Sequence, residues 1–181
     1  MKKFKEFIEN LITESKHDYG CVMLYLDFPE LKNIHNIINK NDIYIDPNDD
    51  SFGLETEPHV TLLYGLHDDV SLDDIKNVIE NYTFDSCKII NTSLFETEKY
   101  DVLKFDVKSS NLHEINKLLT KFPYTTDYPD YHPHMTIAYL KPGTGKKYID
   151  KIKLENNFIE PLYVVYSMTD GSKKKININI D

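Results

Sequence analysis

The residues best suited to chemistry belong to a seven-residue phrase that the chain contains twice. Residues 58–64 read PHVTLLY and residues 133–139 read PHMTIAY, so Pro, His, Thr and Tyr recur in one frame. A lone His-x-Thr is expected about 0.5 times in a shuffled chain of this composition, but the full frame only about 0.0015 times. The repetition is therefore not a chance match.

Side chains two positions apart on a β-strand point to the same face. His59 and Thr61 then project together, as do His134 and Thr136, whereas the residues between them face a core. If the two strands are neighbours, two imidazoles and two hydroxyls converge. One histidine can accept a proton from a nucleophile, the other can protonate a leaving oxygen, and the hydroxyls can donate to phosphate oxygens. The pattern predicts phosphodiester chemistry without a metal; the alternative is a pair of structural strand residues.

The two motifs, His59-Val-Thr-Leu62 and His134-Met-Thr-Ile137, resemble those of the 2H phosphoesterases. The resemblance implies an α/β (α+β) fold with two pseudo-symmetric lobes of mainly antiparallel sheet, flanking helices and a central cleft. It also implies a hydrolase that acts on 2′,3′-cyclic phosphates or on 2′–5′ and 3′–5′ linkages and needs no cofactor. Its catalytic residues would be His59, Thr61, His134 and Thr136. We expect residues 1–181 to form one such domain, with one motif in each lobe.

Longer stretches at residues 19–24, 53–66 and 131–143 resemble the phage anti-CBASS nucleases. Those enzymes degrade the cyclic di- and trinucleotides that bacteria use as antiviral signals. The resemblance implies a substrate such as 3′,3′-cyclic GMP-AMP or cyclic tri-AMP, and a place in the host cytoplasm if the protein is encoded by a phage. Two alternatives remain: a 2H phosphodiesterase of RNA 2′,3′-cyclic phosphates or 2′–5′ linkages, and a non-catalytic sponge for cyclic nucleotides.

The chain has no Trp, so any stacking on bases must come from Tyr or Phe. Tyr64 and Tyr139 end the repeated phrase, three positions after each Thr. In a regular strand this odd spacing puts them on the opposite face, so core packing and ligand contact both remain open. The other substrate-binding candidates, each with a packing or solvated role as its alternative, are Tyr19, Tyr131 and Tyr166 for bases, Lys141 for phosphate and Glu160 for a purine edge.

Metal and disulfide chemistry have weak support in the sequence. His132 and His134 form a His-x-His pair, but only Asp127 and Asp130 are close in sequence, so we predict no metal site. Cys21 and Cys87 are too few for a disulfide framework and lie in apolar stretches, which predicts buried thiols.

Composition limits the partners of the protein. The chain carries 30 acidic and 21 basic residues, a formal net charge of −9, and concentrates its basic residues only at 141–147 and 173–175. Long nucleic acids are usually bound by a broad basic face, so a short anionic ligand is the better expectation. We also expect a cytoplasmic protein with no membrane segment, because no stretch is long and apolar enough, and with no obligate protein partner.

Apolar periodicity and turn residues predict interleaved helices and strands. We expect helices at residues 3–15, 30–40, 71–82, 111–122 and 146–152. We expect strands at 20–28, 59–64, 84–95, 100–108, the second motif, 159–168 and 173–180, and loops at 41–56 and 123–133.

Overall fold

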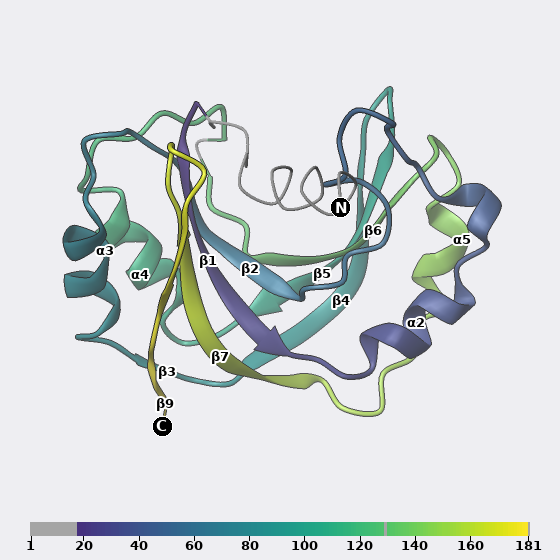
Figure 1. The fold of residues 1–181 in the computed structure, drawn as a ribbon. Helices are drawn as coiled ribbons and strands as arrows, with labels where there is room; N and C mark the ends of the chain where they lie inside the picture. Colours follow the sequence, from purple (N-terminus) through teal and green to yellow (C-terminus); the bar gives the residue numbers. More distant parts are fainter. Residues whose placement is uncertain (1–17, 129, 181) are drawn as a thin grey trace, which may run out of the picture.

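The computed structural model describes residues 18–128 and 130–180, and Figure 1 shows their arrangement. The helix predicted at residues 3–15 lies outside this range. The strands are β1 (Gly20–Asp27), β2 (His59–Leu66), β3 (Thr83–Phe84), β4 (Cys87–Glu96), β5 (Asp101–Lys108), β6 (His134–Leu140), β7 (Phe158–Ser167), β8 (Lys173–Ile176) and β9 (Asn179–Ile180). The helices are α2 (Leu31–Ile37), α3 (Leu72–Ile79), α4 (Leu112–Leu119) and α5 (Lys146–Ile149), with a 3-10 turn at Lys40–Asp42.

Seven strands form one antiparallel sheet in the order β1-β2-β6-β5-β4-β7-β8, and β1 also pairs with β7. The second pairing closes six of these strands into a ring. Two seams of the ring are thin: β2 meets β6 only at Val60 and Met135, and β4 meets β7 at two residue pairs. The predicted α+β class with a mainly antiparallel sheet is confirmed, whereas the division into two lobes around a cleft stays a prediction.

The helices fall into two pairs at opposite ends of the sheet (Figure 1). Ser71 caps helix α3: its side chain accepts from the Asp74 N–H while the Asp74 carboxylate accepts from the Ser71 N–H. Helix α4 buries its apolar stripe against α3 and β2. Both helices end three residues earlier than predicted, at Ile79 and Leu119.

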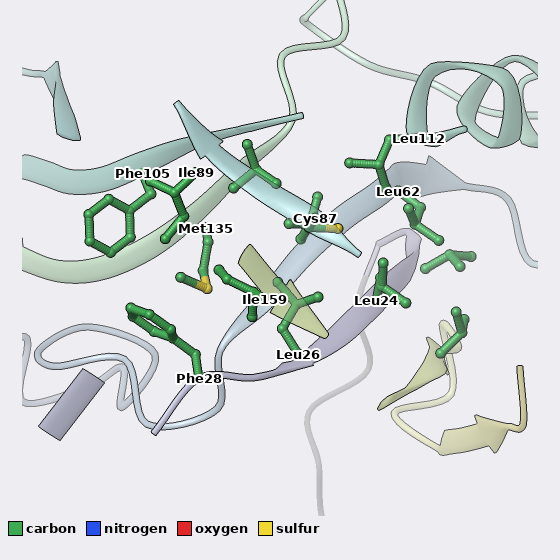
Figure 2. Close-up of a cluster of buried hydrophobic side chains, with 14 of the residues drawn as sticks. Leu24, Leu26, Phe28, Leu62, Cys87, Ile89, Phe105, Leu112, Met135 and Ile159 are labelled. Atoms are coloured by element: carbon green, nitrogen blue, oxygen red, sulfur yellow. The ribbon is translucent and has the colours of Figure 1, made fainter. Parts of the chain in front are cut away.

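The core lies on the face of the motif strands that carries Val60, Leu62, Met135 and Ile137, all fully buried. Figure 2 shows part of it, with Met135 among apolar side chains from strands distant in the sequence. As predicted, this alternation leaves the intervening His and Thr residues on the other face, where each is only partly exposed. Both cysteines are free; Cys87 is fully buried, and Cys21 is partly exposed.

Beyond the thin β2–β6 seam, each motif strand pairs with a loop. The segment before β2 lies along β6, where Tyr44 N donates to Tyr139 O at 2.9 Å and Glu55 N donates to Ile137 O at 3.0 Å. The segment before β6 lies along β2, where Thr125 N donates to Gly65 O at 2.9 Å. Each loop therefore leads into one motif and pairs with the strand that carries the other, which couples the positions of both.

Candidate active site

The register of the two motif strands brings the four predicted catalytic residues together. The strands are antiparallel and Val60 pairs with Met135. Counting outward from that pair places Thr61 beside His134 and His59 beside Thr136. Each imidazole thus neighbours the hydroxyl of the other motif. The two motifs are thus related by an approximate 180° rotation about an axis through the Val60–Met135 pair.

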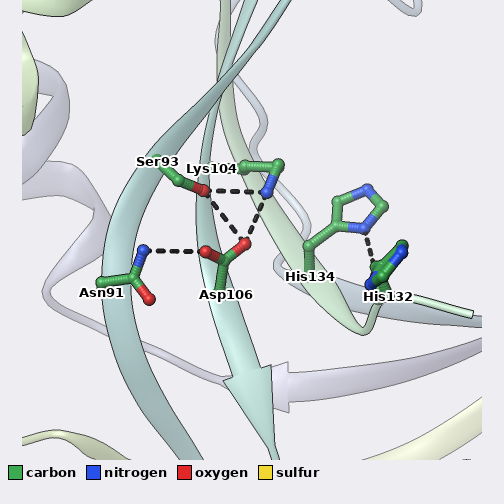
Figure 3. A network of polar contacts seen from close by, with 6 residues as sticks. All are labelled: Asn91, Ser93, Lys104, Asp106, His132 and His134. Atoms are coloured by element: carbon green, nitrogen blue, oxygen red, sulfur yellow. Dashed lines mark hydrogen bonds and ion pairs between the residues drawn. The ribbon is translucent and has the colours of Figure 1, made fainter.

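The two imidazoles are held in the same way. His59 Nδ1 lies 2.8 Å from the carbonyl oxygen of Glu57, and His134 Nδ1 lies 2.8 Å from that of His132 (Figure 3). A carbonyl oxygen only accepts, so Nδ1 of each ring carries the hydrogen. The neutral form of each histidine then has its lone pair on Nε2. Both rings therefore present an atom that can take up or release a proton.

A one-residue bulge follows each motif and explains the tyrosine of the repeated phrase. On β2 the register passes from Thr61 to Leu63 across one step of β1, so Leu62 is an extra residue. On β6 the register skips Ile137 in the same way. An extra residue reverses the alternation of faces. Tyr64 and Tyr139 therefore return to the face that carries the histidines and threonines, instead of the opposite face expected for a regular strand.

Side chains from two helices hold these bulges. The carbonyl oxygen of Leu62 accepts a hydrogen bond of 2.7 Å from Asn116 Nδ2 of α4. The carbonyl oxygen of Ile137 lies 3.1 Å from His35 Nε2 of α2. Each helix pair thus supplies one polar side chain that contacts a buried backbone carbonyl beside one motif. Neither Asn116 nor His35 was predicted from the sequence to support the site.

Aromatic rings accompany both tyrosines. Tyr64 is half exposed and meets the edge of Tyr19 at 6.2 Å between ring centroids. Tyr139 packs in a cluster with Phe52, at 5.0 Å between ring centroids, and Tyr100, at 5.5 Å. One tyrosine lies beyond each motif, so the four central residues have an aromatic group at either end of the face.

The strand beside the first motif supplies aromatic contacts. Tyr25, which is opposite His59, stacks on the His59 ring at 5.5 Å and on Tyr163 at 5.1 Å. Lys175 Nζ lies 3.9 Å from the centre of the Tyr163 ring. Burial, together with the charge of nearby Glu57, raises the pKa of the Tyr25 hydroxyl to about 12. Tyr25 therefore supports His59 as a neutral phenol.

The strand beside the second motif supplies charged groups instead. Lys104 is opposite Thr136 and Asp106 is opposite His134. The Lys104 ammonium donates to Ser93 Oγ at 2.8 Å and to Asp106, and the Asn91 amide donates to Asp106 at 2.8 Å (Figure 3). This network was not predicted from the sequence, although its charges alternate with buried Leu103 and Phe105 along β5. That alternation was the available signal.

The electrostatics of this side favour a neutral His134. Burial lowers the pKa of His134 below its usual value, and the charges of Lys104 and His59 act in the same direction. The His132 carbonyl and the Asp106 carboxylate oppose them, but the net shift is downward. The dependence on His59 also shows that the two imidazoles lie within electrostatic reach of each other.

The other predicted binding residues have varied surroundings. Tyr166 is 1% exposed and its hydroxyl donates to Val70 O, so the expectation that it stacks on a base is wrong. The hydroxyl of Tyr131 donates to Thr61 O at 3.0 Å, which supports the first motif strand from its backbone. Glu160 is exposed and accepts from Ser86 Oγ at 2.8 Å. These contacts do not test the predicted roles of Tyr131 and Glu160.

Lys141, the predicted phosphate-binding lysine, directly follows β6. Lys141 is exposed, and five residues from Thr136 correspond to roughly 16 Å of strand. Its neighbours Lys146 and Lys147 form ion pairs with Glu96 at 3.2 Å and Asp42 at 2.6 Å. These two lysines, the first residues of α5, are thus engaged elsewhere, and a role for Lys141 stays a prediction.

A surface hollow opens next to Tyr64 and is lined by Asp18, Tyr19, His67, Asp68, Thr125, Thr169 and Asp170.

Within residues 18–128 and 130–180, no three His, Cys, Asp or Glu side chains are grouped so that they could hold a metal ion. In the same residues, no helix combines the length and apolar character needed to cross a membrane.

The chain is thus an α+β protein with two Pro-His-x-Thr-x-x-Tyr motifs on neighbouring antiparallel strands, on one face of a closed sheet. Residues 55–168, more than half of the chain and including both motifs, match the family of the anti-CBASS protein Acb1. The chain belongs to the Acb1 family. No curated protein matches it. A solved crystal structure of a phosphoesterase is similar, with 12% identity, a TM-score of 0.48, and coverage of 88% of this chain and 95% of the other.

Proposed function

We propose that this protein is a metal-independent phosphodiesterase that hydrolyses 3′–5′ linkages of cyclic di- and trinucleotides and thereby counters CBASS signalling. One observation carries the proposal: two histidines, each with Nδ1 bound to a carbonyl, lie beside the threonine of the other motif. Membership of the Acb1 family supports the anti-CBASS part of the proposal.

The arrangement can carry out an in-line displacement at phosphorus. The Nε2 of one histidine removes a proton from a water or from the 2′-OH of the ligand. That oxygen attacks phosphorus, the bond from phosphorus to the 5′ oxygen breaks, and the Nε2 of the other histidine protonates the leaving oxygen. Meanwhile Thr61 and Thr136 donate to the non-bridging oxygens as negative charge grows on them. The first product is linear and ends in a 3′-phosphate or, after 2′-OH attack, a 2′,3′-cyclic phosphate.

The surroundings of the four residues suit a small cyclic ligand. Tyr64 and Tyr139 lie at opposite ends of the face, so each can contact a base on one side of the scissile phosphate. Tyr19 extends the first of these aromatic positions. The net charge of −9 does not favour a long nucleic acid. We propose that the protein acts on the small ligand alone, without an obligate partner.

Turnover of radiolabelled 3′,3′-cyclic GMP-AMP and cyclic tri-AMP, measured in excess EDTA, tests the proposal. We expect linear products from the wild type. We expect about 10²–10⁴-fold slower turnover from His59→Ala and His134→Ala, and about 10–10³-fold slower turnover from Thr61→Val and Thr136→Val. Lys117→Ala, at an exposed position of α4, is the control.

The alternatives give different results in the same assay. A substrate panel with an RNA 2′,3′-cyclic phosphate and a 2′–5′ oligoadenylate would show preferred cleavage of RNA if the protein is an RNA-processing enzyme. Tight binding without turnover by wild type and histidine variants alike would identify a sponge. Loss of turnover in EDTA that Zn²⁺ or Mn²⁺ restores would contradict metal independence.

A further inference from the structure

The pseudo-symmetry of the two motifs does not extend to the strands that flank them. On β1, Tyr25 and Met23 are opposite the histidine and threonine of the first motif. On β5, Asp106 and Lys104 occupy the matching positions opposite the second motif. One side of the face is therefore aromatic and apolar, and the other carries a fixed pair of charges.

The Lys104 ammonium is held in a defined place with donor capacity left over. Its side chain is only 15% exposed, which is unusual for lysine. Among the described residues it donates to two acceptors, Ser93 Oγ and Asp106 Oδ1. An ammonium group has three N–H donors, so one remains for a ligand. The strand register points this side chain to the same face as its cross-strand neighbour Thr136.

The carboxylate that holds Lys104 stays ionised. Burial raises the pKa of Asp106, but the hydrogen bonds from Lys104, Ser93 and Asn91 outweigh burial and keep that pKa below its usual value. Asp106 itself is 38% exposed and so is reached by solvent. The network is thus a positioned cation beside a threonine and a histidine of the candidate active site, and the mechanism above does not use it.

We propose, on the basis of the proposed function, that Lys104 is a phosphate-binding residue. Its free N–H donates to a non-bridging oxygen of the scissile phosphate next to the Thr136 hydroxyl, and its charge stabilises the negative charge that grows in the transition state. Asp106, with Asn91 and Ser93, is a positioning residue that fixes the ammonium.

The same cation assigns the proton-transfer roles. The charged and titratable groups that face His134 are Lys104 and Asp106 on β5 and His59 on β2. Lys104 disfavours a second positive charge on His134, so His134 is the base that takes the proton of the nucleophile. His59, whose Nδ1 lies 3.8 Å from the carboxylate of Glu55, is then the residue that donates a proton to the leaving oxygen.

Four variants test the inference: Lys104→Met, Asp106→Asn, the double variant of both, and Lys108→Met as control. Lys108 is an exposed lysine of the same strand, roughly 13 Å along it. Two quantities are measured for each variant: turnover of cyclic dinucleotide, and affinity for adenosine 3′-monophosphate as a phosphate probe. Thermal unfolding confirms that each variant is folded at the assay temperature.

We expect Lys104→Met to lower kcat about 10²-fold and to weaken binding of the probe about tenfold, with Lys108→Met unchanged. The double variant should stay as slow as Lys104→Met. Recovery of wild-type turnover in the double variant would overturn the inference, because Lys104 would then only neutralise Asp106. Turnover and probe affinity of Lys104→Met within twofold of wild type would also overturn it.

The two measurements, turnover and probe affinity, distinguish a failure of the Lys104 assignment from a failure of the proposed function. If the wild type cleaves no cyclic nucleotide, the proposed function fails and probe affinity alone decides the role of Lys104. If the wild type cleaves it and folded Lys104→Met is equally active, the function stands and the assignment of Lys104 fails.

Discussion

Gly65 is the point where a single methyl group should disturb the coupling between the two motifs. Its φ is +108°, in the region that residues with a Cβ rarely adopt. A Cβ built there would lie 1.9 Å from the carbonyl oxygen of Thr125, the residue whose N–H donates to the Gly65 carbonyl. Gly65→Ala therefore adds backbone strain and forces the loop before the second motif away from β2.

Gly53 separates these two effects. Its φ is +105°, almost the same, but a Cβ there meets nothing within 4 Å. Strain alone should cost Gly53→Ala about 1–3 kcal/mol. Displacing Thr125 adds about 2–4 kcal/mol for Gly65→Ala, from overpacking and the weakened hydrogen bond. At about 2–4 °C per kcal/mol for a chain of this size, Tm of Gly65→Ala should lie roughly 4–16 °C below that of Gly53→Ala.

Thermal unfolding followed by circular dichroism measures this difference, and turnover well below both Tm values shows whether the active site is disturbed. We expect Gly65→Ala to lose turnover as well, because Thr125 belongs to the segment that leads into His134. Equal Tm values for the two variants would refute the reasoning, since the contact with Thr125 is the feature that distinguishes them.

Three further results are expected. Turnover should rise with pH through an apparent pKa below about 6.5, because the base His134 is held neutral, and Lys104→Met should move that acidic limb to higher pH; a limb that does not move contradicts the charge effect. The double His59→Ala, His134→Ala variant should lose far less than the product of the single losses, since both act on one step; multiplicative losses would indicate separate steps. Asn116→Leu should lower the free energy of unfolding by about 1–3 kcal/mol, measured by urea titration, because the Leu62 carbonyl loses its hydrogen-bond donor. Asn77→Leu, at an exposed position of α3, serves as the control and should change that free energy much less.

The sequence predicted the convergence of the motifs because period-two alternation and a repeated frame are local signals. It could not predict the bulges. One extra residue in a strand leaves no mark on apolar periodicity, since Leu62 and Ile137 are as apolar as the core positions beside them. The side on which Tyr64 and Tyr139 lie therefore remained open until the register of the strands was known.

The residues opposite each motif on the neighbouring strands could not be predicted from the sequence for a different reason. Lys104 and Asp106 belong to the site because β5 pairs with β6, and strand order is a property of the whole sheet. Tyr166 was misjudged for the same reason. It lies three residues after Tyr163 on β7, which puts the two rings on opposite faces, and the side on which Tyr163 meets Tyr25 is the side of the motifs.

A duplicated motif alone poses a difficulty for acid–base catalysis, because one proton must leave the nucleophile while another reaches the leaving group. Two histidines with the same hydrogen bond to a carbonyl would share one preferred protonation state if their surroundings also matched. In this protein the motif is repeated but the strands beside it differ: Tyr25 is opposite His59, whereas Asp106 is opposite His134 and Lys104 lowers the pKa of His134. The repeated motif gives both rings the same geometry, and the unequal flanking strands place the charged pair Lys104 and Asp106 beside the second motif only. On this reasoning, exchanging the flanking charges should reverse which histidine is the base, whereas removing them should leave two histidines that compete for one proton.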